Sequence, residues 1–202
     1  MVLNSTRRFD KKAAILAAKK LVSRNALVLD TETTGLGTQD EIVELSIIDM
    51  GGGVLINTLV KPTILITPGA SAIHGISNTD ISSAPYITQI LPELTHMLKN
   101  NIIAIYNAEF DLRMLRQSLN AHGKTTPHYL HNNVYCIMEL YSIFNGEFDE
   151  IKMRYKWIEL SVAASRLGIV VPQTLHRAKI DAELTRQVIL RIADSECSNI
   201  DS

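Results

Sequence analysis

The residues best suited to chemistry in this sequence are two acids at the end of a short apolar run. In Leu27-Val-Leu-Asp-Thr-Glu-Thr-Thr-Gly-Leu36, the apolar residues stop at Asp30 and Glu32. Side chains at positions i and i+2 of a strand share a face, so these carboxylates should lie side by side. Paired carboxylates on a rigid strand end suit a hard divalent cation. An isolated Asp-x-Glu is more often a solvated strand edge, so the remaining acids decide between the two interpretations.

Two later segments carry acids at helix starts. In Tyr106-Asn-Ala-Glu-Phe-Asp-Leu-Arg-Met-Leu115, Asp111 lies in the first turns of a helix that follows a strand. In Leu175-His-Arg-Ala-Lys-Ile-Asp-Ala-Glu-Leu184, Asp181 lies one turn into the last helix and His176 just precedes it. Each signal alone is weak, because the helix dipole favours acids in a first turn and a lone histidine is commonly a solvent-facing loop residue. Only the convergence of all three segments at one place would indicate a shared site.

Hydrophobic periodicity supplies the elements that must position these residues. Strands are expected at 26–31, 42–49, 54–60, 102–106 and 133–137, and Gly51-Gly-Gly53 predicts a hairpin turn. Helices are expected at 9–24, 85–99, 108–120, 138–144, 158–167 and 177–193, with an irregular segment at 62–77 and an excursion at 145–157. This order predicts an α/β fold with a mixed sheet, its three leading strands antiparallel and its later strands parallel, and helices on both faces.

The composition is that of an ordinary globular chain. The 202 residues suit one domain, with 46% hydrophobic residues, 20% charged residues and a net charge of −1. Near-neutral charge argues against a protein that coats nucleic acid by bulk electrostatics. No apolar run is long enough for a membrane span or a signal peptide. Cys136 and Cys197 make neither a metal-ligand spacing nor a disulfide framework, so we expect a cytoplasmic protein without membrane partners.

The charge is unevenly distributed. Residues 1–24 hold seven bases and one acid, a net +6, which leaves −7 for the remainder. Such a run is either the solvated face of a helix or a basic arm that guides a polyanion. We accordingly divide the chain into a basic helical extension at 1–25, the main domain at 26–195 and a tail at 196–202.

The three acidic segments resemble the three motifs of the DEDDh family of 3′–5′ exonucleases. That family includes the proofreading subunit of the bacterial replicative DNA polymerase, ribonuclease T and oligoribonuclease. The resemblance runs from about Leu27 to Leu190 and includes two further matches, His74-Gly-Ile-Ser and Trp157-Ile-Glu-Leu-Ser-Val-Ala-Ala. At Cys136 many relatives have an aspartate, which is not a metal ligand, so this departure should leave the chemistry intact.

The resemblance implies a ribonuclease H-like fold and metal-dependent removal of nucleotides from the 3′ end of single-stranded DNA. Two divalent cations, Mg²⁺ or Mn²⁺, would activate water and neutralise the phosphate and the leaving oxygen. The implied metal ligands are Asp30, Glu32, Asp111 and Asp181. His176 is implied as the general base, a role suited to an imidazole.

The resemblance also implies contacts to the terminal nucleotide. His74 is expected near that nucleotide, with Thr33, Thr34 and Leu36 lining the same pocket. Asn107 and Phe110 are further substrate-contact candidates, although Asn107 equally suits the strand-to-helix turn and Phe110 the core.

Several alternatives stay open. RNA trimming of the oligoribonuclease type uses the same catalytic residues, since discrimination depends on contacts to the 2′-OH. A binding module without catalysis is a third alternative, and association with a polymerase or as a homodimer is undecided.

Overall fold

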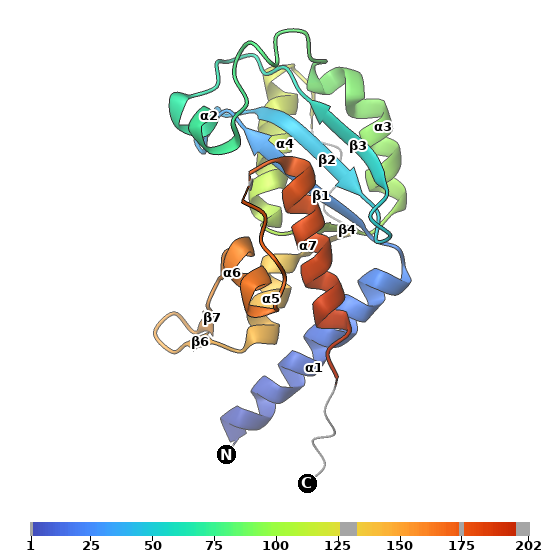
Figure 1. The fold of residues 1–202 in the computed structure, drawn as a ribbon, viewed down its shortest axis with the longest axis vertical. Coiled ribbons are helices and arrows are strands. Elements are labelled where there is room, and N and C mark those ends of the chain that lie inside the picture. The colour runs from blue at the N-terminus through green and yellow to red at the C-terminus, as the bar shows by residue number, and fades with distance from the viewer. Residues whose placement is uncertain (1, 126–132, 174–175, 197–202) are drawn as a thin grey trace.

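The computed structural model describes residues 2–125, 133–173 and 176–196, with side chains from residue 10 onward. Its centre is a five-stranded sheet with strand order β3-β2-β1-β4-β5 (Figure 1). The strands are β1 (Leu27–Thr33), β2 (Ile42–Ile48), β3 (Val54–Leu59), β4 (Ile103–Ile105) and β5 (Val134–Cys136). The first three pair antiparallel, whereas β4 is parallel to β1 and β5 is parallel to β4. The predicted mixed sheet is therefore confirmed.

Helices pack on both faces of this sheet (Figure 1). They are α1 (Val2–Ser23), α2 (Pro68–His74), α3 (Ile87–Asn100), α4 (Ala108–Ala121), α5 (Ile137–Asn145), α6 (Leu160–Arg166) and α7 (Ala178–Ala193). A small hairpin of β6 (Phe148–Asp149) and β7 (Arg154–Tyr155) occupies the excursion expected at 145–157. Within the described ranges, none of these helices has the length and apolar character needed to cross a membrane.

Side-chain alternation along β1 separates two apolar cores. Val28 belongs to a cluster that contains buried side chains of α1, α5, α6 and α7. Leu29 belongs to the other cluster, which contains buried side chains of α3 and α4. Because successive side chains alternate, Asp30 and Glu32 share the face of Val28, and Thr31 shares the face of Leu29. The two acids therefore point toward α7, and Thr31 points toward α4.

Helix α1 is longer than the helix expected at 9–24, and its second half packs into the domain. It contacts α5 and α7. Its buried side chains lie in the same apolar cluster as those of α7: Ala14, Ile15, Ala18 and Leu21. The Tyr155 hydroxyl also donates to the Asp10 carboxylate at 2.6 Å, which ties the hairpin to this helix. The tail expected at 196–202 falls outside the described residues, apart from Glu196.

The segment expected to be irregular at 62–77 contains helix α2, so that part of the prediction was wrong. The Thr67 hydroxyl accepts from the Ala70 N–H at 3.2 Å, and Pro68 occupies the first turn, where its fixed φ favours a helix. Gly75 ends the helix in the left-handed region at φ 73. The Thr67 N–H and hydroxyl both donate to the Thr34 carbonyl, at 3.0 and 2.9 Å. These bonds hold α2 across the end of β1.

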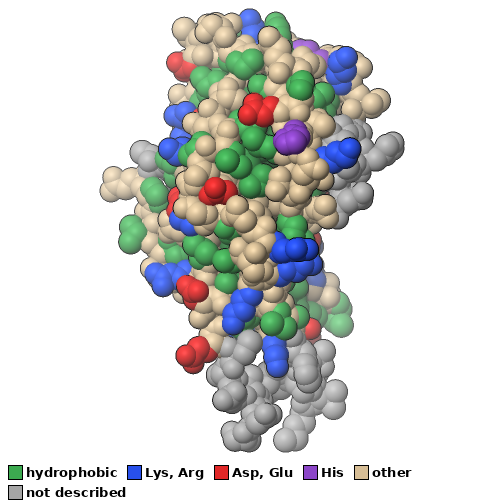
Figure 2. Space-filling model, turned by 90° about the vertical axis from the view of Figure 1, so that its right-hand side faces the viewer, with side chains coloured by type: hydrophobic (Ala, Val, Ile, Leu, Met, Phe, Trp, Pro, Cys, Tyr) green, Lys and Arg blue, Asp and Glu red, His purple; other side chains and the backbone are tan. Residues whose placement is uncertain are grey.

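Charged side chains of both signs are interspersed on the face drawn in Figure 2. They lie among hydrophobic and polar residues, as expected for a chain of net charge −1. Among the described residues on this face, no broad basic surface indicates binding of nucleic acid by bulk electrostatics.

Candidate active site

An acidic cluster forms where β1 meets the first turn of α7. One carboxylate oxygen from each of Asp30, Glu32 and Asp181 lies within 4.8 Å of the others, and all three residues are partly buried. The Asp181 Oδ1 atom is buried and has no hydrogen-bond partner. An unpaired buried oxygen is costly, and such an atom commonly marks a place that an ion or a water completes. The all-oxygen donor set fits a hard divalent cation.

The pKa values of the acids in the cluster also indicate a cation site. Burial, followed by the charge of Asp181, raises the pKa of Glu32 to about 8. Burial and the charges of Asp111 and Asp181 raise the pKa of Asp30 above its ordinary value. Burial also raises the pKa of Asp181, although His176 opposes that rise. Without a cation, the cluster therefore retains protons that isolated carboxylates would lose.

Asp111 approaches from the other face of the sheet. Its Oδ1 accepts a buried hydrogen bond from the Thr31 hydroxyl at 2.8 Å. Burial raises the pKa of Asp111 to about 7, although the bond from Thr31 opposes the rise. The charge of Asp111 also contributes to the raised pKa of Asp30. The structure thus groups three of the four predicted ligands and leaves Asp111 beside them, outside the 4.8 Å group.

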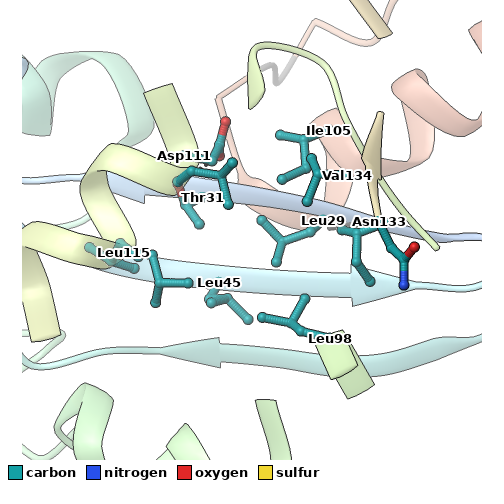
Figure 3. A pocket seen from close by; sticks show the side chains of 12 residues that line it. Leu29, Thr31, Leu45, Leu98, Ile105, Asp111, Leu115, Asn133 and Val134 are labelled. Carbon is teal, nitrogen blue, oxygen red and sulfur yellow. Dashed lines mark hydrogen bonds between the residues drawn. The ribbon is translucent and has the colours of Figure 1, made fainter. Parts of the chain in front are cut away.

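A small cavity opens on the α4 side of the sheet, with Thr31 and Asp111 among its lining side chains (Figure 3). The other labelled side chains are apolar apart from Asn133, and they include Leu29, Leu45 and Leu98 (Figure 3). Its volume of about 10 Å³ approximates the room needed by one water molecule. This cavity is too small for a nucleotide and belongs to the packing of the core. The predicted ligands Asp30, Glu32 and Asp181 do not line this cavity.

His176 lies directly before α7, and its backbone is bonded to the acidic cluster. Its N–H donates to Asp181 Oδ2 at 3.1 Å, and its side chain is exposed. Its φ of 66 lies in the left-handed region, which residues other than glycine seldom adopt. Unusual backbone conformations of this kind often occur at functional sites. The local turn brings the predicted base and a predicted metal ligand together.

Two threonines expected in the substrate pocket are buried, and their hydroxyls bond within the protein. The Thr33 hydroxyl donates to the Gly35 carbonyl at 2.8 Å. The Thr34 hydroxyl donates to the Asp40 carboxylate at 2.6 Å and accepts from the Glu41 N–H at 3.0 Å. The hydroxyls thus stabilise the turn after β1, and contact between these threonines and a nucleotide stays a prediction.

His74, the expected contact to the terminal nucleotide, is also buried. Its Nδ1 accepts from the Ile76 N–H at 3.0 Å, so Nε2 carries the proton and donates to the Thr33 carbonyl at 3.2 Å. Burial lowers the pKa of His74, which favours this neutral form. The ring therefore ties the end of α2 to the end of β1, and its contact with substrate stays a prediction.

The other three expected contacts are more accessible. Leu36 is 76% exposed. Asn107 is exposed, and its side chain makes no hydrogen bond to cap α4, although its backbone carbonyl accepts from the Phe110 N–H at 2.9 Å. Phe110 packs partly against the core, and the Arg113 guanidinium lies 5.3 Å from its ring centroid. Leu36 and Asn107 thus remain available to a ligand, whereas Phe110 is partly engaged by the core.

Sequence reasoning missed two residues at this site, Glu44 and Arg177. Glu44 lies directly opposite Glu32 in the β1–β2 register and is 2% exposed. Its carboxylate accepts from Arg177 Nη2 at 2.7 Å and from Nε at 3.0 Å. The available signal was an acid inside the mostly apolar run Ile42-Val-Glu-Leu-Ser-Ile-Ile48. Acids are almost never fully buried unless they are paired, so a buried Glu44 should have a positively charged or hydrogen-bonding partner.

The metal-free protein is expected to lose stability as pH rises from about 4.5 to about 8. The folded-state pKa values of about 8 for Glu32 and about 7 for Asp111 exceed the ordinary values of 4.5 and 3.8. Between these values the folded protein keeps protons that the unfolded chain has released, so the free energy of unfolding falls as pH rises. In EDTA, calorimetry should show Tm falling by on the order of 5 °C.

Saturating Mn²⁺ at the higher pH should reverse this loss. A ligand at a hundred times its Kd adds about 2.7 kcal/mol, which corresponds to about 5–10 °C in Tm for a chain of this size. A melting curve that responds neither to pH in EDTA nor to Mn²⁺ would count against the acidic cluster as a cation site.

The mixed sheet with helices on both faces is the ribonuclease H-like fold that the motifs predicted, and the end of its β1 strand carries the acidic cluster. Residues 27–189 match the family model described as exonuclease. The chain belongs to this exonuclease family, which confirms the resemblance found in the motifs. It is an enzyme of the exonuclease class.

Individual relatives agree with this assignment. The uncharacterized exonuclease CP81 of Escherichia phage 186 is 37% identical over 179 residues, covering 87% of this chain and 92% of that protein. The DNA polymerase III PolC-type protein of Thermotoga maritima is 31% identical, over 83% of this chain but 12% of that protein. A solved structure of exonuclease X in complex with 5′ overhanging duplex DNA is similar with a TM-score of 0.61 and 25% identity. That similarity covers 83% of this chain and 90% of the other.

Proposed function

We propose that this exonuclease removes nucleotides one at a time from the 3′ end of single-stranded DNA and releases nucleoside 5′-monophosphates. The observation that carries the proposal is the approach of Asp30, Glu32 and Asp181 within 4.8 Å, with His176 bonded to Asp181. DNA as the polymer is supported by the similar exonuclease X, whose complex contains 5′ overhanging duplex DNA.

The acidic side chains would hold two Mg²⁺ or Mn²⁺ ions, with Asp30, Glu32 and Asp181 as ligands and Asp111 contributing from the α4 side. When bound, such ions neutralise charge on the phosphate and the leaving oxygen and acidify a water molecule. The exposed ring of His176 takes the proton of the attacking water as general base. The water oxygen bonds to phosphorus, and the bond from phosphorus to the 3′ oxygen of the preceding nucleotide breaks.

Two exposed apolar side chains are suited to the terminal base. Leu36 is 76% exposed and follows the turn after β1, and Ile73 is 57% exposed on α2. The bonds from Thr67 and His74 hold α2 against the end of β1, so these segments meet beside the acidic cluster. We propose that Leu36 and Ile73 contact the terminal nucleotide from the two segments.

The decisive experiment is digestion of oligonucleotides labelled at the 5′ end. Single-stranded DNA should give a ladder of progressively shorter labelled products with Mg²⁺ or Mn²⁺, and no products in EDTA. Immediate release of a labelled mononucleotide would instead show trimming from the 5′ end and contradict the proposal. Parallel reactions on duplex DNA, RNA and a diribonucleotide test the polymer. Faster hydrolysis of RNA or of the diribonucleotide than of DNA would show that the preferred substrate is RNA.

A further inference from the structure

An ion pair joins the segment that carries His176 and Asp181 to the strand beside the two β1 acids. Arg177 lies between His176 and α7, and its guanidinium donates twice to Glu44 of β2, from Nη2 at 2.7 Å and from Nε at 3.0 Å. The Ala178 N–H, in the first turn of α7, also donates to Glu44, at 2.9 Å. Three donors therefore satisfy one carboxylate.

The burial of Glu44 makes its pairing with Arg177 necessary. The side chain of Glu44 is 3% exposed, whereas that of Arg177 is 47% exposed. A buried carboxylate is tolerated only with charged or hydrogen-bonding partners, and a bidentate guanidinium fixes direction as well as distance. Arg177 is the residue directly before α7, and its side chain does not cap the helix. The first N–H groups of a helix have no partner within the helix, and Glu44 accepts from one of them, that of Ala178.

The pair also lies where it can control the acidic cluster. Glu44 is the register partner of Glu32, on the strand next to β1. The Arg177 carbonyl accepts from the Asp181 N–H at 3.0 Å, and Asp181 accepts from the His176 N–H at 3.1 Å. A shift of Arg177 would therefore move the backbone on which the predicted base and a predicted ligand depend.

We propose that Glu44 and Arg177 are positioning residues that set the start of α7 against β1 and β2. They thereby fix His176 and Asp181 relative to Asp30 and Glu32, without touching substrate. This inference rests on the proposed function of the same site. It assigns a mechanistic role to two side chains outside the predicted catalytic set.

The test compares Arg177→Lys with Arg186→Lys. Lysine keeps the charge but cannot reproduce the two-pronged contact with Glu44. Arg186 is a matched control, because it is also on α7, pairs with Glu183 at 2.7 Å and donates to the Met50 carbonyl at 2.9 Å. The measurements are kcat, KM for single-stranded DNA, the Mn²⁺ concentration for half-maximal activity, and Tm.

Arg177→Lys is expected to lower kcat by about 10- to 100-fold and to raise the required Mn²⁺ concentration, as for other residues that orient metal ligands. The KM for the oligonucleotide should change by less than about threefold. Arg186→Lys should leave all three kinetic values near those of the wild type. Adding Glu44→Gln to Arg177→Lys should cause little further loss of kcat, because the two residues act as a unit.

Two results would overturn the inference. Equal kinetics for Arg177→Lys and Arg186→Lys would show that the pair has no special role. A raised KM with unchanged kcat would show that Arg177 contacts the nucleic acid instead. If the wild type hydrolyses none of the substrates, the proposed function is wrong, but the inference about Glu44 and Arg177 can still be tested. The test is then calorimetric titration of each protein with Mn²⁺ in the absence of nucleic acid. Weaker Mn²⁺ binding by Arg177→Lys than by the wild type would support the inference, and equal binding would overturn it.

Discussion

Asp181→Asn is expected to lower the kcat for exonuclease activity by about a thousandfold or more, which is about 4 kcal/mol of transition-state stabilisation. Asparagine keeps the size of the side chain and an oxygen for the His176 N–H, which lies 3.1 Å from Asp181 Oδ2. It removes one of the three carboxylates whose oxygens lie within 4.8 Å of one another. The loss should therefore reflect cation binding and not a collapse of the start of α7.

The same substitution should not weaken the metal-free fold. The charge of Asp181 raises the pKa of both Asp30 and Glu32, so its removal relieves repulsion. In EDTA at about pH 8, the Tm of the variant should equal or exceed that of the wild type, and the response to Mn²⁺ should be largely lost. An unchanged or raised Tm in EDTA together with a lost response to Mn²⁺ would show that Asp181 binds the cation and does not stabilise the metal-free fold.

Asp194→Asn is the matched control, because Asp194 is at the opposite end of α7. Kinetic constants and the Mn²⁺ response of this control should match those of the wild type. Full activity of Asp181→Asn, or equal losses in both variants, would refute the assignment of the acidic cluster as the catalytic centre.

His176→Ala is expected to lower kcat by about 10²- to 10⁴-fold, the usual contribution of a positioned general base. The exposed imidazole is removed, whereas its backbone N–H, which binds Asp181, remains. Binding of Mn²⁺ should therefore change far less than kcat. Single-turnover hydrolysis and calorimetric titration with Mn²⁺ measure the two effects separately.

His96→Ala provides the comparison for this variant, because His96 is an exposed histidine on α3. It should hydrolyse DNA at the wild-type rate. If His176→Ala also retained the wild-type rate, His176 would not be the base. If it lost Mn²⁺ binding to the same extent as activity, the histidine would act through the acidic cluster and not on water.

The sequence by itself determined which residues of each segment share a face. Strand alternation is a local property, so Asp30 and Glu32 were predicted to lie side by side, and the structure places them in one cluster. The spacing of His176 and Asp181 likewise spans one turn at the start of a helix, and the backbone bond between them is local. The mixed sheet also followed from the order of the elements along the chain.

Local patterns were less informative where short segments depend on distant partners. Helix α2 was missed although Thr67, Pro68 and Gly75 are local start and stop signals, because its seven residues are too few to show a helical period. Bonds from Thr67 and His74 hold it at the distant end of β1. The sequence predicted four carboxylate ligands without saying how each reaches the site, and the structure brings Asp111 in from the opposite face, where it accepts a hydrogen bond from Thr31. Core packing determines which face of the sheet a helix covers, and this cannot be predicted from residue spacing.

The pairing of Glu44 with Arg177 is the clearest case that only the tertiary structure decided. The two residues are 133 positions apart, and Glu44 lies outside the three segments that resemble the family motifs. The sequence specified an acid within an apolar strand, and burial makes a partner necessary because an unpaired buried charge is strongly unfavourable. The identity of that partner followed from the docking of α7 on β1 and β2, which depends on the whole packed core.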